Sequence, residues 1–327
     1  MRLIAFALTL IVMAAFLSSS GESPRPLLGR NPAMAAKPVP LDASDPAMRR
    51  VGLLSFLGGA HLTSPDAAFG GFSSMHVAGD RFTLLSDGGN IVRFRMGADW
   101  RPFEVGFGDL PGGPQAGWRK SDRDSESMTW DPASGRHWVG FEQYNAIARY
   151  APGLAALEAM AEPAAMRSWP ENGGPESLVR LRNGRFLVMS EMGGWKGRPG
   201  RAALMFAGDP AVPGQRSLPF VYIPPRGYDP TDMAQLPDGR VLVLNRAFGI
   251  PELFTSQLEI IDVAAIRRGS VVRGREVARL EPPLVHENFE GLAITRESGA
   301  TIVWLVSDDN REWFQRTLLL KFRLELR

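Results

Sequence analysis

The chain contains 327 residues, of which 44% are hydrophobic and 22% are charged, and this composition excludes an intrinsically disordered chain. The net charge of +2 is too small to indicate a nucleic-acid partner, and the lack of cysteine excludes disulfide bonds. The 35 glycines and 26 prolines are typical of a protein in which many short strands are joined by tight turns.

The first 20 residues have the layout of a secretory signal peptide. Arg2 is followed by an uncharged run, Leu3–Leu17, and then by small polar residues. This run is about 15 residues long, whereas roughly 20 are needed to span a bilayer. We therefore expect an exported protein, periplasmic or secreted, with no membrane span once residues 1–20 are removed. An uncleaved anchor is the alternative, because no clean cleavage site stands out.

Residues 21–48 are rich in Pro, Ala and Ser and show no periodicity, so we expect a flexible leader before a single domain at 49–327. In that domain one pattern recurs five times, about every 55 residues. Each copy has a small or acidic residue, an alternating apolar stretch, a turn and a more hydrophobic second strand. The second strands are expected at 81–87, 136–142, 185–191, 240–246 and 301–308, and two of the turns before them are the hairpin signals Asn183-Gly184 and Asp238-Gly239.

Each repeat also offers a third and a fourth strand, the fourth strand of repeat four being expected at Val271–Leu280. The last repeat has only Thr317–Leu324 before the chain ends. This pattern predicts an all-β fold, a β-propeller with five blades of four strands. The missing strand is expected from Val51–Leu57, which would pair beside the C-terminal strand and close the ring. Six blades are the alternative, if the loops at 106–122 or 193–201 hold further strands.

Acidic residues recur at the start of the first strand of each repeat. Because that strand lines the central channel of a propeller, its first residues should lie at one mouth of the channel. The second strands end at the same rim. The residues expected there are Glu126, Glu176, Asp232 and Glu290 at the strand starts, and Asp87, Glu142, Glu191, Arg246, Asp308 and Asp309 at the strand ends.

So many carboxylates at one rim repel each other unless they bind a cation, pair with arginine or hold a proton. Calcium is the natural candidate, because it takes six to eight oxygen ligands and tolerates irregular geometry. Zinc is disfavoured because the four histidines are scattered along the chain. The structural alternative is that an acid binds backbone N–H groups of the next blade and clamps the ring. The predicted metal ligands are Glu126, Glu176, Asp232, Glu290, Asp308 and Asp309.

Arg246 stands where other repeats have an acid, and we expect it to hold an anionic substrate. A salt bridge to Asp232 or Glu290 is the equal alternative. The predicted catalytic residues are Glu126, Glu176, Glu290 and Arg246. Lys120, Arg123 and Arg311 are weaker loop candidates for binding the anionic substrate. There is no G-x-S-x-G nucleophile elbow and no phosphate-binding P-loop.

The order of these motifs resembles the "esterase-like activity of phytase" family of bacterial exported proteins. The most specific motifs are Asn288-Phe289-Glu290-Gly291-Leu292 and Ser307-Asp308-Asp309-Asn310, and the resemblance runs from about residue 69 to 324. Glu126-Ser127 and Glu176-Ser177 stand where several members of the family have Glu-Gly, so the acid is kept. The resemblance implies a propeller hydrolase that acts on ester or phosphoester bonds.

Two classes of function are therefore carried forward. The first is a calcium-assisted hydrolase that acts on a small anionic or ester substrate. Its variant without phosphate is a lactonase. The second is a non-catalytic propeller of the cell envelope, whose rim binds a ligand or a partner. A monomer is expected in both cases.

Overall fold

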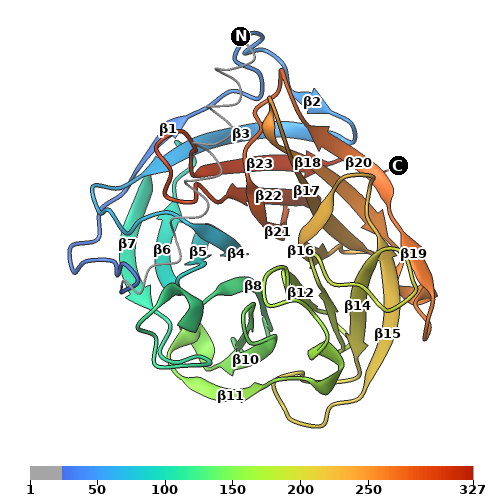
Figure 1. The fold of residues 1–327 in the computed structure, drawn as a ribbon. Helices are drawn as coiled ribbons and strands as arrows, with labels where there is room; N and C mark the ends of the chain where they lie inside the picture. Colours follow the sequence, from blue (N-terminus) through green and yellow to red (C-terminus); the bar gives the residue numbers. More distant parts are fainter. Residues whose placement is uncertain (1–23, 327) are drawn as a thin grey trace, which may run out of the picture.

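The structure, a computed structural model, describes residues 24–326 and shows five sheets arranged in a ring around a central channel (Figure 1). The predicted signal peptide lies outside the described residues. The described helical segments are four 3-10 turns: η1 (Lys120–Asp122), η2 (Pro152–Leu154), η3 (Ala164–Met166) and η4 (Val263–Ala265). The all-β, five-bladed prediction is confirmed, and 106–122 and 193–201 hold no strand of a further blade, only the end of β7 and the first residue of β14.

The first three blades follow one another along the chain, each with its first strand next to the channel. Blade 1 contains β4 (Phe72–Ala78), β5 (Arg81–Ser86), β6 (Asn90–Met96) and β7 (Pro102–Asp109). Blade 2 contains β8 (Ser125–Trp130), β9 (His137–Phe141), β10 (Ala146–Tyr150) and β11 (Leu157–Ala161). Blade 3 contains β12 (Ser177–Arg180), β13 (Phe186–Met189), β14 (Arg201–Phe206), β15 (Ser217–Ile223) and, at its edge, β19 (Val271–Arg273).

The last two blades complete the circle. Blade 4 contains β16 (Asp229–Gln235), β17 (Val241–Gly249), β18 (Leu253–Ile261) and β20 (Arg275–Leu280). Blade 5 contains β21 (Phe289–Glu297), β22 (Ala300–Ser307), β23 (Leu318–Leu324) and β3 (Leu54–Thr63), with β1 (Ala35–Pro38) and β2 (Arg50–Val51) paired to β3.

The ring closes where the two ends of the chain meet, as the sequence predicts. β3 pairs antiparallel with β23 from Leu54↔Leu324 to His61↔Leu318. Phe56 and Phe322 pack against each other across this seam, with ring centroids 5.4 Å apart. Because the first and last strands share one sheet, neither is left as an open edge towards its neighbour.

Two segments differ from the sequence-based expectation. The stretch expected as one strand at Val271–Leu280 forms two: β19 runs parallel to β15 in blade 3, and β20 pairs with β18 in blade 4. The two strands part at Gly274, where a Cβ atom would overlap the Glu259 side chain. Part of the segment expected as a flexible leader is folded, because β1 pairs with β3 and Arg25 forms an ion pair with Asp109 at 2.6 Å.

The hydrophobic core lies between the blades and not inside any one of them. The middle strands of each blade are covered on both faces by the neighbouring sheets, so runs such as Val241–Leu244 are fully buried. Phe82 of blade 1 meets Trp304 of blade 5 edge-on, with ring centroids 4.9 Å apart. This packing fixes the direction of each blade and therefore the position of the strand ends that face the channel mouth.

Candidate functional site

A β-bulge interrupts the first strand of four blades at the channel mouth. The pairing skips one residue between β8 and β9, and again between β21 and β22, so that Glu126 and Glu290 each form the extra residue of a bulge. In blades 1 and 4 the extra residues are Ser73 and Thr231. Because a bulge re-aims the side chain of the extra residue, blades 2 and 5 turn a glutamate out of the regular strand alternation.

This register corrects the alignment of the repeats. Glu126 corresponds to Ser73 and Thr231, whereas the sequence pattern aligned it with Gly70 and Asp232. The hydroxyl groups at these two positions donate to the next blade: Ser73 Oγ to the Ser125 carbonyl at 2.6 Å, and Thr231 Oγ1 to the Phe289 carbonyl at 3.3 Å. Blades 1 and 4 therefore use this position to hold the ring together.

Asp232 and Asp309 act as structural clamps, which is the alternative role given above for these acids, and metal binding by them stays a prediction. Asp232 accepts from the Met233 and Leu292 backbone N–H groups, both at 2.7 Å, and joins blade 4 to blade 5. Asp309 accepts from the Gly71 N–H at 2.9 Å and from Thr317 Oγ1 at 2.7 Å. Both oxygens of each carboxylate are therefore occupied by donors of the fold.

The remaining predicted acids do come together. Glu126, Glu176 and Glu290 are each less than a tenth exposed, although they come from three different blades. Burial and then the charge of neighbouring carboxylates raise the pKa of Glu126 and of Glu176 well above the usual value, and each senses Glu290 across the channel. Burial raises the pKa of Asp308 well above its usual value, with Glu290 and Asp87 as the main charged neighbours.

Three carboxyl groups on blade 2 form the tightest cluster among the described residues. Oxygen atoms of Asp124, Glu126 and Glu142 all lie within 4.8 Å of one another. Asp124 Oδ1 is buried and forms an ion pair with Lys120 Nζ at 3.3 Å. An oxygen-only donor set of three carboxyl groups fits a hard cation such as calcium. The sequence pattern had placed Glu142 on the rim but had not singled out Asp124, which directly precedes Ser125-Glu126-Ser127.

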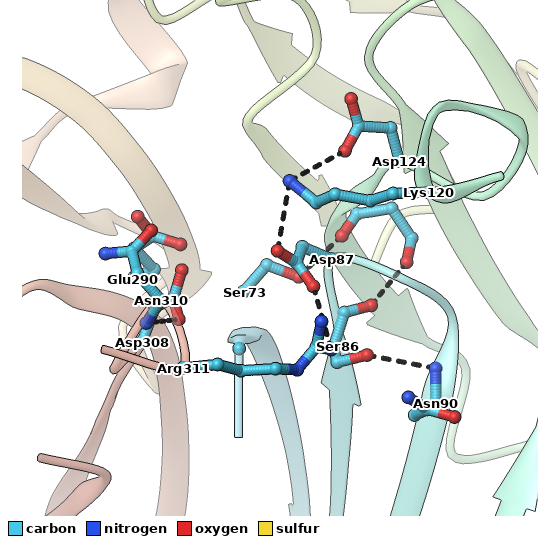
Figure 2. Close-up of polar contacts among 12 residues, drawn as sticks. Ser73, Ser86, Asp87, Asn90, Lys120, Asp124, Glu290, Asp308, Asn310 and Arg311 are labelled. Atoms are coloured by element: carbon cyan, nitrogen blue, oxygen red, sulfur yellow. Dashed lines mark hydrogen bonds and ion pairs between the residues drawn. The ribbon is translucent and has the colours of Figure 1, made fainter. Parts of the chain in front are cut away.

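Lys120 and Arg311 supply positive charge beside Asp87, and Lys120 also lies beside Asp124 (Figure 2). Lys120 Nζ lies 3.0 Å from Asp87 Oδ2 and 3.3 Å from Asp124 Oδ1. Arg311 Nη2 lies 3.3 Å from Asp87 Oδ1. The Asp87, Asp124 and Glu126 carboxylates hold the pKa of Lys120 above its usual value in spite of burial, so this side chain is a permanent cation.

Arg246 joins acids from two other blades. Its guanidinium donates to Glu191 of blade 3, to Glu290 of blade 5 and, at 2.6 Å, to Asn288 Oδ1. Asn288 in turn donates to Glu290 at 2.9 Å. The alternative of a salt bridge to Glu290 is therefore the arrangement observed. Each of the two terminal nitrogens of Arg246 already faces a carboxylate, so the first role of Arg246 is to neutralise Glu191 and Glu290.

The mouth nevertheless keeps an excess of acid. Among the described residues, eight carboxyl groups meet three cations, Lys120, Arg246 and Arg311; the eight are Asp87, Asp124, Glu126, Glu142, Glu176, Glu191, Glu290 and Asp308. Protons take up part of the difference. Burial raises the pKa of Glu290 to about 7, and burial together with neighbouring carboxylates raises the pKa of Glu142 and of Glu176 above the usual value.

Fold and mouth together define a class of protein: a single β-propeller with a buried, partly protonated carboxyl cluster at one end of its channel. The chain belongs to the Phytase-like family, described as "Esterase-like activity of phytase", whose family model matches residues 67–311. No curated protein matches the chain in sequence. Among the described residues no helix is long and apolar enough to cross a membrane.

Three solved structures are similar to the chain at low identity, each with a TM-score under 0.5. A protein of unknown function from Bacteroides thetaiotaomicron is 11% identical with a TM-score of 0.49, covering 89% of this chain and 76% of that one. An endo-arabinase from the same species is 10% identical with a TM-score of 0.48, covering 80% and 96%. A putative 6-phosphogluconolactonase from Bacteroides fragilis is 13% identical with a TM-score of 0.40, covering 81% and 74%.

Proposed function

We propose that this protein is an exported hydrolase that cleaves ester or phosphoester bonds at the acidic mouth of the channel, with calcium as its metal. Membership of the phytase-like family supports hydrolysis. The observation that carries the proposal is the cluster of Asp124, Glu126 and Glu142, whose oxygens lie within 4.8 Å of one another beside further carboxyl groups of raised pKa.

Asp124, Glu126 and Glu142 are the residues that would hold the ion. Calcium bound there would supply positive charge to a substrate oxygen and to a bound water. Lys120 forms ion pairs with Asp124 of this cluster and with Asp87, and it provides a second positive charge, fixed by the protein, that suits an anionic substrate.

Glu290 and Glu176 are the groups best suited to move a proton. With a pKa of about 7, Glu290 exchanges its proton near neutral pH, which is the condition for an effective general base. Arg246 and Asn288 fix the position of its carboxyl group. Glu176, whose pKa is raised well above the usual value by burial and by Glu126, is the general acid for the leaving group.

The test is hydrolysis of p-nitrophenyl acetate and of p-nitrophenyl phosphate, with calcium or with a chelator. We expect turnover of at least one substrate that the chelator abolishes, and a loss of about 100-fold or more in Glu176→Gln without a fall in melting temperature. Glu276→Gln, a change at an exposed acid on the outer strand β20, is the matched control and should keep full activity. Absence of turnover of both substrates, with and without calcium, would refute the hydrolase and favour a binding propeller of the cell envelope.

A further inference from the structure

Exposed apolar side chains gather on the face of the propeller that carries the acidic mouth. Among the described residues, eleven large hydrophobic side chains are exposed. Six of them lie at this face: Trp118, Met192, Ile250, Trp313 and Phe314 in its loops, and Phe248 near the end of β17. Trp313 is 93% exposed and Ile250 is 67% exposed, so these are loop tips and not partly buried core residues.

The topology places these six residues on one face. In every blade the second strand ends at the mouth, and the turn to the third strand therefore lies on the same side. Met192, Ile250 and Trp313 occupy that turn in blades 3, 4 and 5. Trp118 lies in the connection from β7 to β8, which also runs over this face. The tips thus lie on the connections of several blades, at intervals around the ring.

The arrangement fits a flat apolar surface better than a folded partner. A protein interface buries one contiguous apolar core, whereas these tips stand on separate loops around a polar centre. A propeller face is broad, so loop tips from several blades can reach one plane together. Tryptophan, phenylalanine and aliphatic side chains at such tips are the residues that partition into the headgroup region of a bilayer.

Most of the exposed charge on the same loops is positive, and Glu252, two residues after Ile250, is the exposed acid there. Arg119 follows Trp118, Lys196 and Arg198 follow Met192, and Arg226 lies in the connection from β15 to β16, all of them exposed. The acids of the mouth are buried at the centre of the face. Exposed arginine and lysine beside apolar tips are attracted to anionic headgroups.

We propose that this face docks on a lipid bilayer that carries anionic headgroups, with Trp118, Met192, Ile250 and Trp313 entering the interface. The channel mouth then opens towards the membrane surface. Docking depends on the loop tips and the exposed cations alone, so it stands or falls independently of the proposed hydrolysis.

The test uses residues 24–326, which form the closed ring without the apolar N-terminal segment. The protein is sedimented with vesicles of phosphatidylcholine alone or with one third phosphatidylglycerol, at low and high salt. We expect binding to the anionic vesicles, weakened by salt, and a loss of about 10-fold or more in Trp313→Ser/Ile250→Ser. The matched control, Val212→Ser/Val271→Ser, removes two exposed apolar side chains away from this face and should bind as the parent protein does.

Three results would overturn the docking proposal. One is no binding to anionic vesicles at low salt, and another is an equal loss in both double variants. The third is a parent protein that self-associates in sedimentation equilibrium, ignores vesicles and becomes monomeric in Trp313→Ser/Ile250→Ser, which would assign the tips to a contact between copies. If Trp313→Ser/Ile250→Ser fails to fold, the parent protein is tested with brominated lipid. Docking predicts that the lipid quenches the tryptophan fluorescence, and unquenched fluorescence would overturn the proposal.

Discussion

At the scale of single residues, the acids of the mouth divide into clamps and free carboxyl groups. Asp232 and Glu126 are both almost fully buried, and they aligned at the same position of the repeat pattern. Both oxygens of Asp232 accept hydrogen bonds from backbone N–H groups of two blades, whereas Glu126 faces other carboxyl groups. Burial alone therefore does not identify a functional acid. The hydrogen-bond partners of each carboxylate oxygen distinguish a clamp from a free carboxyl group.

This division predicts opposite effects of two similar substitutions. Asp232→Asn should lower the free energy of unfolding by about 1–3 kcal/mol. The NH2 group of the asparagine would replace a carboxylate oxygen that accepts a hydrogen bond from a backbone N–H in the parent protein. Glu126→Gln should leave stability unchanged or raise it, because it removes one of several mutually repelling acids. Urea denaturation of both variants measures the difference, and equal losses would contradict the distinction.

Arg246 is expected to be essential for stability before it is essential for catalysis. Arg246→Gln leaves Glu191 and Glu290 without their cation, and we expect a loss of about 3 kcal/mol, the low end for a buried pair because the arginine is 21% exposed. The double variant Arg246→Gln/Glu290→Gln should recover part of that loss. A double variant no more stable than Arg246→Gln would show that the guanidinium does not act through Glu290.

At the scale of elements, β4 and β9 carry a pair of histidines that the sequence left scattered. His76 and His137 join blades 1 and 2 through a ring-to-ring hydrogen bond of 3.2 Å, and His76 lies against the Trp130 ring with centroids 3.9 Å apart. Burial lowers the pKa of His76 to about 3 and of His137 to about 4, with His137 and Arg93 respectively as the charged neighbours. Both imidazoles are thus neutral in the folded protein.

The histidine pair makes stability dependent on pH in a known direction. The unfolded chain takes up protons at these two residues near pH 6.5, whereas the folded protein does not until about pH 4 to 3. Stability from this source is therefore complete above pH 6.5 and falls as the pH drops below it. Melting temperatures between pH 8 and pH 5 should fall less steeply in His76→Phe than in the parent protein. Parallel curves would contradict the assignment.

The closing seam between β3 and β23 is a second element on which the fold depends. Phe322 is fully buried and packs on Phe56 across the seam. Phe322→Ala should cost about 3–5 kcal/mol, the usual effect of removing a buried phenyl ring. An exposed residue of the same strand, Arg323, serves as control, and Arg323→Ala should change the midpoint of urea unfolding little.

The sequence predicts the elements well because strand periodicity and turn residues are local signals. The second strands, the closure by the N-terminal run and the five-blade count follow from them. The site is predicted less completely, because a bulge shifts the pattern by one residue without changing its composition. That shift explains why Asp232 and not Thr231 aligned with Glu126. Lys120 reaches the mouth from a loop, where no period fixes its direction.

At the scale of the whole molecule, the ring converts five separate stretches of sequence into one electrostatic site. No blade alone carries more than three of the eight carboxyl groups, and Arg246 of blade 4 binds acids of blades 3 and 5. The buried charge is thus coupled to ring closure. A cation that binds the mouth should stabilise the closed ring by mass action, and the melting temperature should rise with calcium concentration in the parent protein but less in Glu126→Gln.

The central claim is that Asp124, Glu126 and Glu142 form a cation site at the mouth of a five-bladed ring. Anomalous diffraction from a crystal soaked in terbium, a calcium analogue, tests it directly. We expect the strongest anomalous peak within ligand distance of these three carboxyl groups. A peak at another place with none at the mouth, or a mouth in which the three groups point apart, would contradict it.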